Sequence, residues 1–305
     1  MEIIVLNRED NLINIEEKVN ALIEAMPFIK KYKGKTVVVK FGGNAMINEE
    51  VKNAVIEDAV LLQALGVNVV LSHGGGPAIN KMLERLNIKS EFVNGLRVTS
   101  KEVIEVVEMV LSGSVSADLV KKVAALGGKA VSLSGSDGGI YFCKKNESDY
   151  DYGFVGEVVS VNPDSINALI NAGFIPIISP IGADDKGNSY NINGDTAAGA
   201  LASALKAEKL ILLTDIEGLC NDIKIKDVIS YLNIKDVAKL KEIGTIAGGM
   251  IPKVDSCVEA IKNGVNQVHI MDGRKAHSLL YEAFVEEGGH GTVVGEAKDS
   301  VGIKW

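Results

Sequence analysis

The stretch Val37-Val38-Val39-Lys40-Phe41-Gly42-Gly43 runs an apolar strand directly into a pair of glycines. Further along the chain, Val69-Val70-Leu71-Ser72-His73 leads in the same way into Gly74-Gly75-Gly76. Because glycine has no Cβ, backbone N–H groups at such a junction can approach an anion closely. A helix that begins there adds its positive N-terminal end at the same place. Two such junctions, the first of which carries a lysine, predict a site that holds and transfers phosphate.

Outward from these junctions, apolar strands alternate with helical patterns. Strands are predicted at residues 36–41, 67–72, 129–133, 175–179, 209–214, 266–270 and 291–294. Helices are predicted at residues 49–65, 77–86, 100–112, 114–126, 163–172, 195–206, 235–243, 252–263 and 275–287, with a hairpin-type insertion over 137–160. This order is typical of a mainly parallel sheet covered on both faces, in which ligands bind at the carboxyl ends of the strands.

The net charge of −8 argues against a general role in binding nucleic acids or membrane surfaces. No apolar run is long enough to span a membrane, and the first ten residues lack the features of a signal peptide. Cys143, Cys220 and Cys257 match no disulfide framework or zinc motif, which predicts free thiols and a cytoplasmic location. The four histidines form no pair with metal-binding spacing, so no metal site is predicted.

The familiar nucleotide-binding motifs are missing from the sequence. It contains neither the GxxxxGK[ST] of a P-loop nor the GxGxxG of a dinucleotide site, and neither HRD nor DFG of the protein kinases. A phosphate site would therefore be assembled from residues that lie far apart in the chain. The candidates are polar residues beside glycines, namely Lys40, Asn191-Ile192-Asn193-Gly194-Asp195, Thr214-Asp215 and Gly248-Gly249-Met250-Ile251-Pro252-Lys253.

Two lysines beside glycine pairs can converge on one phosphoryl group from both sides. Phosphoryl transfer depends on positioning and charge neutralisation more than on covalent help from the protein, so this pair suits it. Each residue also has a simpler explanation. Lys40 and Lys253 can be solvated surface amines, Asp195 can be the N-cap of a helix, and Asp215 can be a turn residue.

Arg97 is one of only four arginines and sits in the turn Asn94-Gly95-Leu96-Arg97-Val98-Thr99. A guanidinium group binds a carboxylate with two parallel hydrogen bonds, which lysine does poorly. The alternative is a surface arginine that pairs with Glu91 or Glu102.

Taken together, these motifs resemble the amino-acid kinase family, and within it the branch whose acceptor is N-acetyl-L-glutamate. The resemblance runs from about Lys18 to Gly295. It is carried by VVVKFGGNAM (37–46), LSHGGGPAIN (71–80), NGLRVT (94–99), YNINGDTAAGALA (190–202), KLILLTDIEGL (209–219) and GGMIPKV (248–254). One departure is Gly194, where the family commonly has alanine.

The resemblance implies a three-layer αβα sandwich with an open, mainly parallel sheet. It also implies three regions: a kinked oligomerisation and regulatory helix (1–34), an acceptor-binding N-lobe (35–185) and an ATP-binding C-lobe (186–305). The implied reaction phosphorylates the γ-carboxylate of N-acetyl-L-glutamate with ATP and Mg²⁺, the second step of arginine biosynthesis. The implied site residues are Lys40, Lys253 and Asp195 for catalysis; Gly75, Gly76, Arg97 and Asn191 for the acceptor; and Gly42, Gly43, Asp215, Gly218, Leu219 and Thr245 for the nucleotide.

The apolar positions of residues 11–26, followed by Pro27, predict a kinked helix before the first strand. Family members inhibited by L-arginine have a similar helix, which interlaces dimers into a hexamer. The resemblance therefore implies a homo-oligomer with an arginine site formed by Lys209, His277, Glu282 and Gly288. Whether a PII-type regulator docks on the chain stays open.

Two other readings stay open at this point. A sister kinase would act on glutamate, aspartate or aminoadipate, and Arg97 with Asn191 favours an acylated amino acid over these. A non-catalytic arginine sensor would not need to keep Lys40, Asp195 and Lys253 together, so their joint presence favours an enzyme.

Overall fold

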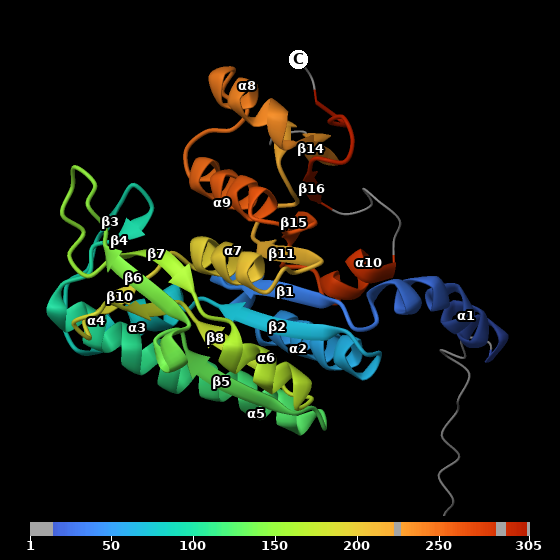
Figure 1. The fold of residues 1–305 in the computed structure, drawn as a ribbon, viewed down its shortest axis with the longest axis horizontal. Coiled ribbons are helices and arrows are strands. Elements are labelled where there is room, and N and C mark those ends of the chain that lie inside the picture. The colour runs from blue at the N-terminus through green and yellow to red at the C-terminus, as the bar shows by residue number, and fades with distance from the viewer. Residues whose placement is uncertain (1–14, 223–226, 285–290, 304–305) are drawn as a thin grey trace, which may run out of the picture.

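The computed structural model describes residues 15–222, 227–284 and 291–303, in which strands and helices alternate (Figure 1). Its centre is an eight-stranded sheet in which β16 runs antiparallel to β15, whereas the other neighbours run parallel. The strand order is β14 (Tyr231–Asn233), β16 (Thr292–Gly295), β15 (Gln267–Asp272), β11 (Lys209–Thr214), β1 (Thr36–Phe41), β2 (Asn68–His73), β8 (Ile175–Ser179) and β5 (Ala130–Ser134).

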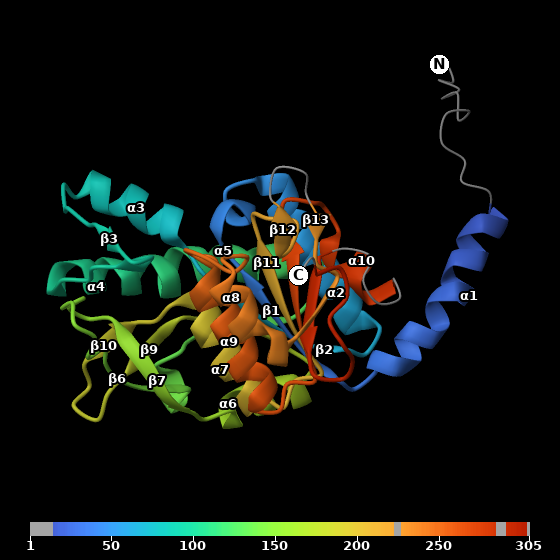
Figure 2. The same cartoon turned by 90° about the horizontal axis from the view of Figure 1, so that it is seen from above.

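Helices cover both faces of this sheet, so the predicted three-layer sandwich is confirmed (Figures 1 and 2). One hydrophobic core joins the sheet to α2 (Glu49–Ala64), α3 (Gly76–Arg85), α4 (Lys101–Glu108), α5 (Ser116–Ala125) and α10 (Ser278–Phe284). The other core joins it to α6 (Asp164–Asn171), α7 (Gly194–Ala204), α8 (Val237–Glu242) and α9 (Met250–Lys262).

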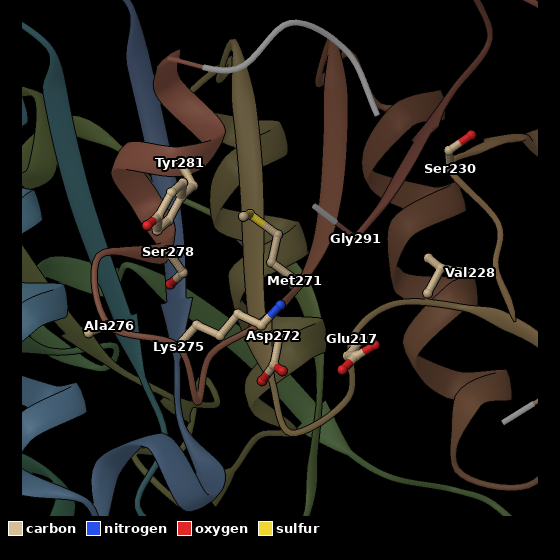
Figure 3. Close-up of a pocket in the computed structure, with 10 residues that line it drawn as sticks. All are labelled: Glu217, Val228, Ser230, Met271, Asp272, Lys275, Ala276, Ser278, Tyr281 and Gly291. Atoms are coloured by element: carbon tan, nitrogen blue, oxygen red, sulfur yellow. The ribbon is translucent and has the colours of Figure 1, made fainter. Parts of the chain in front are cut away.

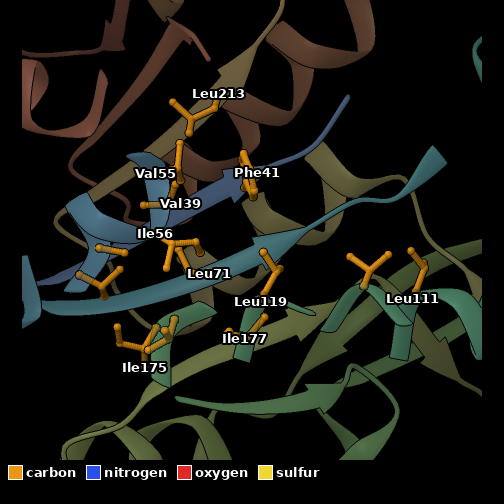
Figure 4. Close-up of a cluster of buried hydrophobic side chains, with 14 of the residues drawn as sticks. Val39, Phe41, Val55, Ile56, Leu71, Leu111, Leu119, Ile175, Ile177 and Leu213 are labelled. Carbon is orange, nitrogen blue, oxygen red and sulfur yellow. The ribbon is translucent and has the colours of Figure 1, made fainter. Parts of the chain in front are cut away.

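The side chains of β1 point alternately to the two faces of the sheet and so belong alternately to the two cores. Val37, Val39 and Phe41 belong to the core shared with α2, where Val39 and Phe41 lie near Val55 (Figure 4). Val38 belongs to the opposite core, which includes α7. Because successive residues of a strand point to opposite faces, Lys40 shares the α7 face with Val38.

Several short elements lie outside the main sheet. The predicted insertion is confirmed as the antiparallel pair β6 (Tyr141–Lys145) and β7 (Gly156–Val161), and two strands that were not predicted join it, β9 (Ile181–Ala183) and β10 (Ser189–Asn191). Two small hairpins complete the strands, β3 (Phe92–Val93) with β4 (Leu96–Arg97) and β12 (Cys220–Asp222) with β13 (Asp227–Val228). Single turns of 3-10 helix are η1 (Gly43–Met46), η3 (Asp137–Gly139) and η4 (Ile234–Asp236).

The helices predicted over 100–112 and 114–126 are joined rather than separate. The π-helical segment η2 (Met109–Val115) connects α4 to α5 without a break. Gly113 separates the two predicted helices, but a π segment accommodates an extra residue per turn while the helix continues.

The N-terminal helix α1 (Ile15–Tyr32) passes through Pro27 and extends away from the body of the molecule (Figures 1 and 2). Its apolar residues Ile15, Leu22 and Ile23 are 61–78% exposed. Of the helices in the described ranges, none is both long enough and apolar enough to cross a membrane.

The predicted lobes share one sheet. Strands from residues 35–185 form one half of it, strands from residues 186–305 form the other, and β1 meets β11 at the junction. β10 lies beyond residue 185 in sequence but pairs with β9 of the first half.

Gly135 allows the main sheet and the β6–β7 sheet to meet, because an ideal Cβ there would overlap the Tyr141 ring and the Ile181 carbonyl oxygen. We expect Gly135→Ala to lower the free energy of unfolding by about 1–3 kcal/mol through overpacking, measured by urea denaturation. Gly113→Ala is the matched control, because Gly113 is exposed with open space around it. It should not lower the free energy of unfolding, because alanine is favoured over glycine in a helix by about 0.5–1 kcal/mol. Equal midpoints for the two variants would contradict this packing.

Candidate active site

Three charged side chains from distant parts of the chain meet at the carboxyl end of β1. The Lys40 ammonium lies 3.0 Å from Oδ1 of Asp195, and the Lys253 ammonium donates to Oδ2 of the same carboxylate at 2.6 Å. Each side chain is only 14–15% exposed. Burial alone would raise the pKa of Asp195, but the charges of Lys40 and Lys253 outweigh it and lower the pKa to about 2. Asp195 is therefore an anion that holds two cations beside each other.

The first turn of α7 places Asp195 in this position. The side chain of Asn193 accepts hydrogen bonds from the N–H groups of Asp195 and Thr196, at 2.9 and 3.2 Å. Asn193 is thus the N-cap, and the alternative that Asp195 caps the helix is wrong. Because Asn193 fills that role, the Asp195 carboxylate can pair with the lysines, and the positive end of α7 adds to its stability.

Lys253 reaches Asp195 from the first turn of the neighbouring helix, α9. The two helices approach closely at Gly199, where an ideal Cβ would lie 3.3 Å from the carbonyl oxygen of Ser256. A larger residue at 199 would therefore push the helices apart. Close packing of α7 on α9 brings the second lysine to the shared carboxylate.

A cavity of about 400 Å³ opens next to Lys40. The two glycine junctions are tied together beside it, since the Gly74 N–H donates to the Phe41 carbonyl at 2.8 Å. Seven of the predicted site residues line this cavity: Lys40, Gly42, Gly43, Gly75, Gly76, Arg97 and Asn191. Asp195 and Lys253 are linked to it through Lys40.

Arg97 is buried at this cavity rather than exposed on the surface. It is 5% exposed and donates to Asn80 Oδ1 at 2.6 Å, to Ser90 Oγ at 2.9 Å and to the Gly76 carbonyl at 3.4 Å. Its guanidinium carbon lies 4.5 Å from the centre of the Phe92 ring. Burial lowers the pKa of Arg97. These partners are neutral, so the alternative that Arg97 pairs with Glu91 or Glu102 is wrong, and the buried charge suits an anionic ligand.

Asn191 also lines the cavity, from β10. Its amide donates to Thr99 Oγ1 at 3.4 Å, and the Thr99 hydroxyl in turn donates to the Arg97 carbonyl at 2.8 Å. The acceptor residues predicted from two distant segments are therefore joined by one chain of hydrogen bonds.

His73 is a polar residue of the site that sequence reasoning did not single out. It is fully buried at the end of β2, with Nδ1 3.0 Å from the Gly74 carbonyl oxygen and Nε2 2.8 Å from Ser116 Oγ. Burial lowers the pKa of His73 to about 4. The signal that could have found it is a histidine that ends a buried strand directly before a glycine cluster.

The predicted nucleotide residues of the C-terminal half follow β11. Asp215 is exposed directly after the strand, and Gly218 adopts φ 154°. Leu219 is 2% exposed, its N–H donates to Thr292 Oγ1, and its carbonyl accepts from the Ile229 N–H. Leu219 is therefore engaged in holding this loop in place. Thr245 precedes the glycines that lead into α9.

A second cavity, of about 580 Å³, lies beside this loop on the α10 side (Figure 3). Glu217, which stands between Asp215 and Gly218, forms part of its wall. Met271 and Asp272 of β15 and Ser278 and Tyr281 of α10 form another part. None of the predicted site residues is among those that line it in the described part of the chain.

The predicted arginine residues lie away from the lysine pair. Lys209 starts β11, at the opposite edge of the sheet, with its ammonium 5.0 Å from the centre of the Tyr32 ring. His277 Nδ1 lies 2.7 Å from Oδ1 of the buried Asp58, and this bond raises the pKa of His277. Both residues lie beside the contact between α2 and α10. Lys209 lines a small cavity together with Leu62 of α2 and Leu279 of α10, and Asp58, the partner of His277, belongs to α2. Gly288 and the side chain of Glu282 lie outside the described residues.

Within residues 15–222, 227–284 and 291–303, no group of three or more His, Cys, Asp or Glu side chains is arranged to hold a metal ion.

The profile of the amino acid kinase family matches residues 35–272. The chain is 53% identical over 283 residues to an acetylglutamate kinase of Heliobacterium modesticaldum, covering 89% of this chain and 96% of the relative. It is 48% identical over 289 residues to an acetylglutamate kinase of Methanocaldococcus jannaschii, covering 91% of this chain and 96% of that protein.

Among solved structures, N-acetylglutamate synthase from Neisseria gonorrhoeae, complexed with coenzyme A and N-acetyl-glutamate, is similar in fold. It superimposes with a TM-score of 0.80 at 24% identity and covers 92% of this chain. This chain spans 64% of the length of that protein.

Proposed function

The chain belongs to the amino acid kinase family, among its acetylglutamate kinases, and from this premise we propose how its residues carry out the reaction. The reaction transfers the γ-phosphoryl group of ATP to the γ-carboxylate of N-acetyl-L-glutamate, a step of arginine biosynthesis. The observation that carries the proposal is the pair of ammonium groups, Lys40 and Lys253, that share the Asp195 carboxylate next to a cavity lined by glycines.

The main obstacle in this reaction is the repulsion between two anions. A γ-carboxylate has a pKa of about 4.3 and is ionised at neutral pH, so it attacks without a general base. Its oxygen forms a bond to the γ-phosphorus while the bond from that phosphorus to the β–γ bridging oxygen breaks and ADP leaves. Lys40 and Lys253 neutralise the transferring group, and Asp195 keeps the two cations at a fixed separation.

The acceptor occupies the 400 Å³ cavity in this proposal. Arg97 binds a carboxylate of N-acetyl-L-glutamate, which supplies the negative charge that its neutral partners lack. Asn191 also binds the acceptor, and the Gly75 and Gly76 N–H groups face the reacting carboxylate.

ATP extends from the lysine pair over the end of β11, toward Asp215, Gly218 and Thr245. Gly42 and Gly43 contact its terminal phosphate. Mg²⁺ enters with ATP and is held mainly by phosphate oxygens and water. The Asp195 carboxylate is engaged by two lysines, which favours metal binding by the nucleotide over binding by this residue. Buried thiols at Cys143 and Cys257 support a reducing, cytoplasmic setting.

The exposed apolar residues of α1 support a homo-oligomer. Val19, Leu22, Ile23 and Met26 recur at helical spacing and are 46–68% exposed. We propose that α1 packs on α1 of a second copy and in this way links dimers of the protein into a hexamer. L-Arginine then binds where α1 meets the body, beside Lys209 and His277, and feeds back on acceptor binding.

An assay of ADP release across acceptors tests the reaction itself. N-acetyl-L-glutamate should support turnover far better than glutamate, aspartate or aminoadipate. Lys253→Ala should lower kcat by roughly 10²–10³-fold because one donor to the transferring group is lost. Lys241→Ala, which removes an α8 lysine paired with Asp255, should leave kcat unchanged. Activity on free glutamate alone, or normal turnover of Lys253→Ala, would contradict the proposal.

Arg97→Lys tests the acceptor pocket. The variant keeps the charge but loses the planar fork, so KM for N-acetyl-L-glutamate should rise roughly 10- to 100-fold while KM for ATP stays constant. Arg85→Lys, at the exposed end of α3, is the matched control. Initial rates with each substrate varied separately give both constants, and an unchanged acceptor KM would remove Arg97 from the site.

Arginine inhibition predicts a shift in the saturation curve for N-acetyl-L-glutamate when L-arginine is added. The double variant Leu22→Glu, Ile23→Glu should reduce the mass found by sedimentation and weaken this inhibition, because the apolar stripe of α1 is disrupted. A saturation curve that stays the same at saturating arginine would exclude the inhibition. An unchanged mass for the variant would exclude assembly through α1.

A further inference from the structure

We propose that His73 is a positioning residue, which sets the direction of the Gly75 N–H group toward the reacting carboxylate of the acceptor. The inference rests on the reaction proposed above. His73 is buried and is not itself among the residues that line the cavity, but its Nδ1 contacts the carbonyl oxygen of Gly74, which does line it.

The contacts of His73 fix which nitrogen carries its proton. A carbonyl oxygen can only accept, so the bond between Nδ1 and the Gly74 oxygen, at 3.0 Å, requires a proton on Nδ1. A neutral imidazole then has no proton on Nε2, which accepts from the Ser116 hydroxyl at 2.8 Å. Ser116 is fully buried and begins α5. The hydroxyl of Ser116 thus selects the tautomer that holds the Gly74 carbonyl.

Holding this carbonyl orients the next N–H group. The C=O of Gly74 and the N–H of Gly75 belong to one planar trans peptide unit and point in opposite directions. With the Gly74 oxygen drawn toward His73, the Gly75 N–H points away from the imidazole. Gly75 lines the 400 Å³ cavity, and its N–H makes no hydrogen bond within the described part of the chain. An acceptor oxygen in the cavity supplies the partner.

The π segment supports the same loop from the other side. Leu111 packs so closely on Gly75 that a Cβ at that position would overlap it, and Val115 lies next to Leu111 in this contact. Ser116 follows Val115 directly. The same helical stretch therefore packs on the Gly75 backbone and also supplies the Ser116 hydroxyl, which bonds to Nε2 of His73.

A direct role in proton transfer does not fit His73. The side chain is completely buried and both ring nitrogens are used in internal hydrogen bonds. The γ-carboxylate needs no base. His73 therefore acts by fixing the orientation of the peptide unit between Gly74 and Gly75.

Two variants separate the two hydrogen bonds. In His73→Asn the side-chain amide can still donate to the Gly74 carbonyl, whereas in His73→Gln the longer side chain can meet Ser116 but not Gly74. We expect His73→Gln to raise KM for N-acetyl-L-glutamate roughly tenfold, the loss of one hydrogen bond to a charged group. His73→Asn should stay within about threefold of wild type, and KM for ATP should stay constant in both.

A purely structural role would give a different result. It would lower the urea midpoints of both variants while leaving the ratio of the two acceptor KM values near one, and that outcome would overturn the proposal. A change in KM for ATP instead of KM for the acceptor would also overturn it. If either variant fails to fold, Ser116→Ala provides the test, since it leaves His73 in place and removes only the hydroxyl. A rise in acceptor KM alone supports the proposal, and unchanged constants contradict it.

The wild-type protein separates this inference from the proposed reaction. If wild type does not phosphorylate N-acetyl-L-glutamate, the reaction fails and the variants need not be measured. If wild type is active while the Asn and Gln variants behave alike, the positioning role of His73 fails and the reaction stands.

Discussion

The site depends on one carboxylate that keeps two ammonium groups together. Without Asp195, Lys40 and Lys253 would repel each other in a setting where each is mostly shielded from water. With it, the cluster carries a net positive charge, and the start of α7 stabilises the anion at its centre. The carboxylate can hold the lysines only because β1, α7 and α9 pack in a fixed order, so the chemistry follows from the layering of the fold.

On the Arg97 side of the cavity, the charged group is held in place in a different way. Arg97 is surrounded by the neutral groups of Asn80, Ser90 and Gly76, and its ring contact is with Phe92. These contacts hold the guanidinium in place without neutralising it. A carboxylate that enters the cavity therefore meets a preorganised charge, and little conformational freedom is lost on binding.

The long strands could be predicted because their sequences are continuous apolar runs, which in β1 and β2 are bounded by glycines. The three-residue strands β9, β10 and β14 could not, because they are too short to show a period and are formed by tertiary pairing. Motifs and resemblance predicted the residues that line the 400 Å³ cavity or meet at the lysine pair, and the roles of these and of the predicted nucleotide and arginine residues stay predictions. The neutral partners of Arg97, the burial of Leu219 and the link from His73 to Ser116 depend on which distant segments meet, which one sequence does not reveal. The cap at Asn193 is local, but Asn and Asp are both favoured N-cap residues, so the sequence does not decide between Asn193 and Asp195.

The shared sheet has a mechanical consequence. β1 and β11 are hydrogen-bonded neighbours in its interior, and the strands from residues 35–185 and from residues 186–305 meet at that pair. A rotation of one half against the other would therefore have to change the twist between β1 and β11, because the hydrogen bonds of this pair join the two halves. The β3–β4 and β6–β7 hairpins lie outside the main sheet and are not held by it in this way. The sheet is thus a continuous restraint on the relative position of the two halves.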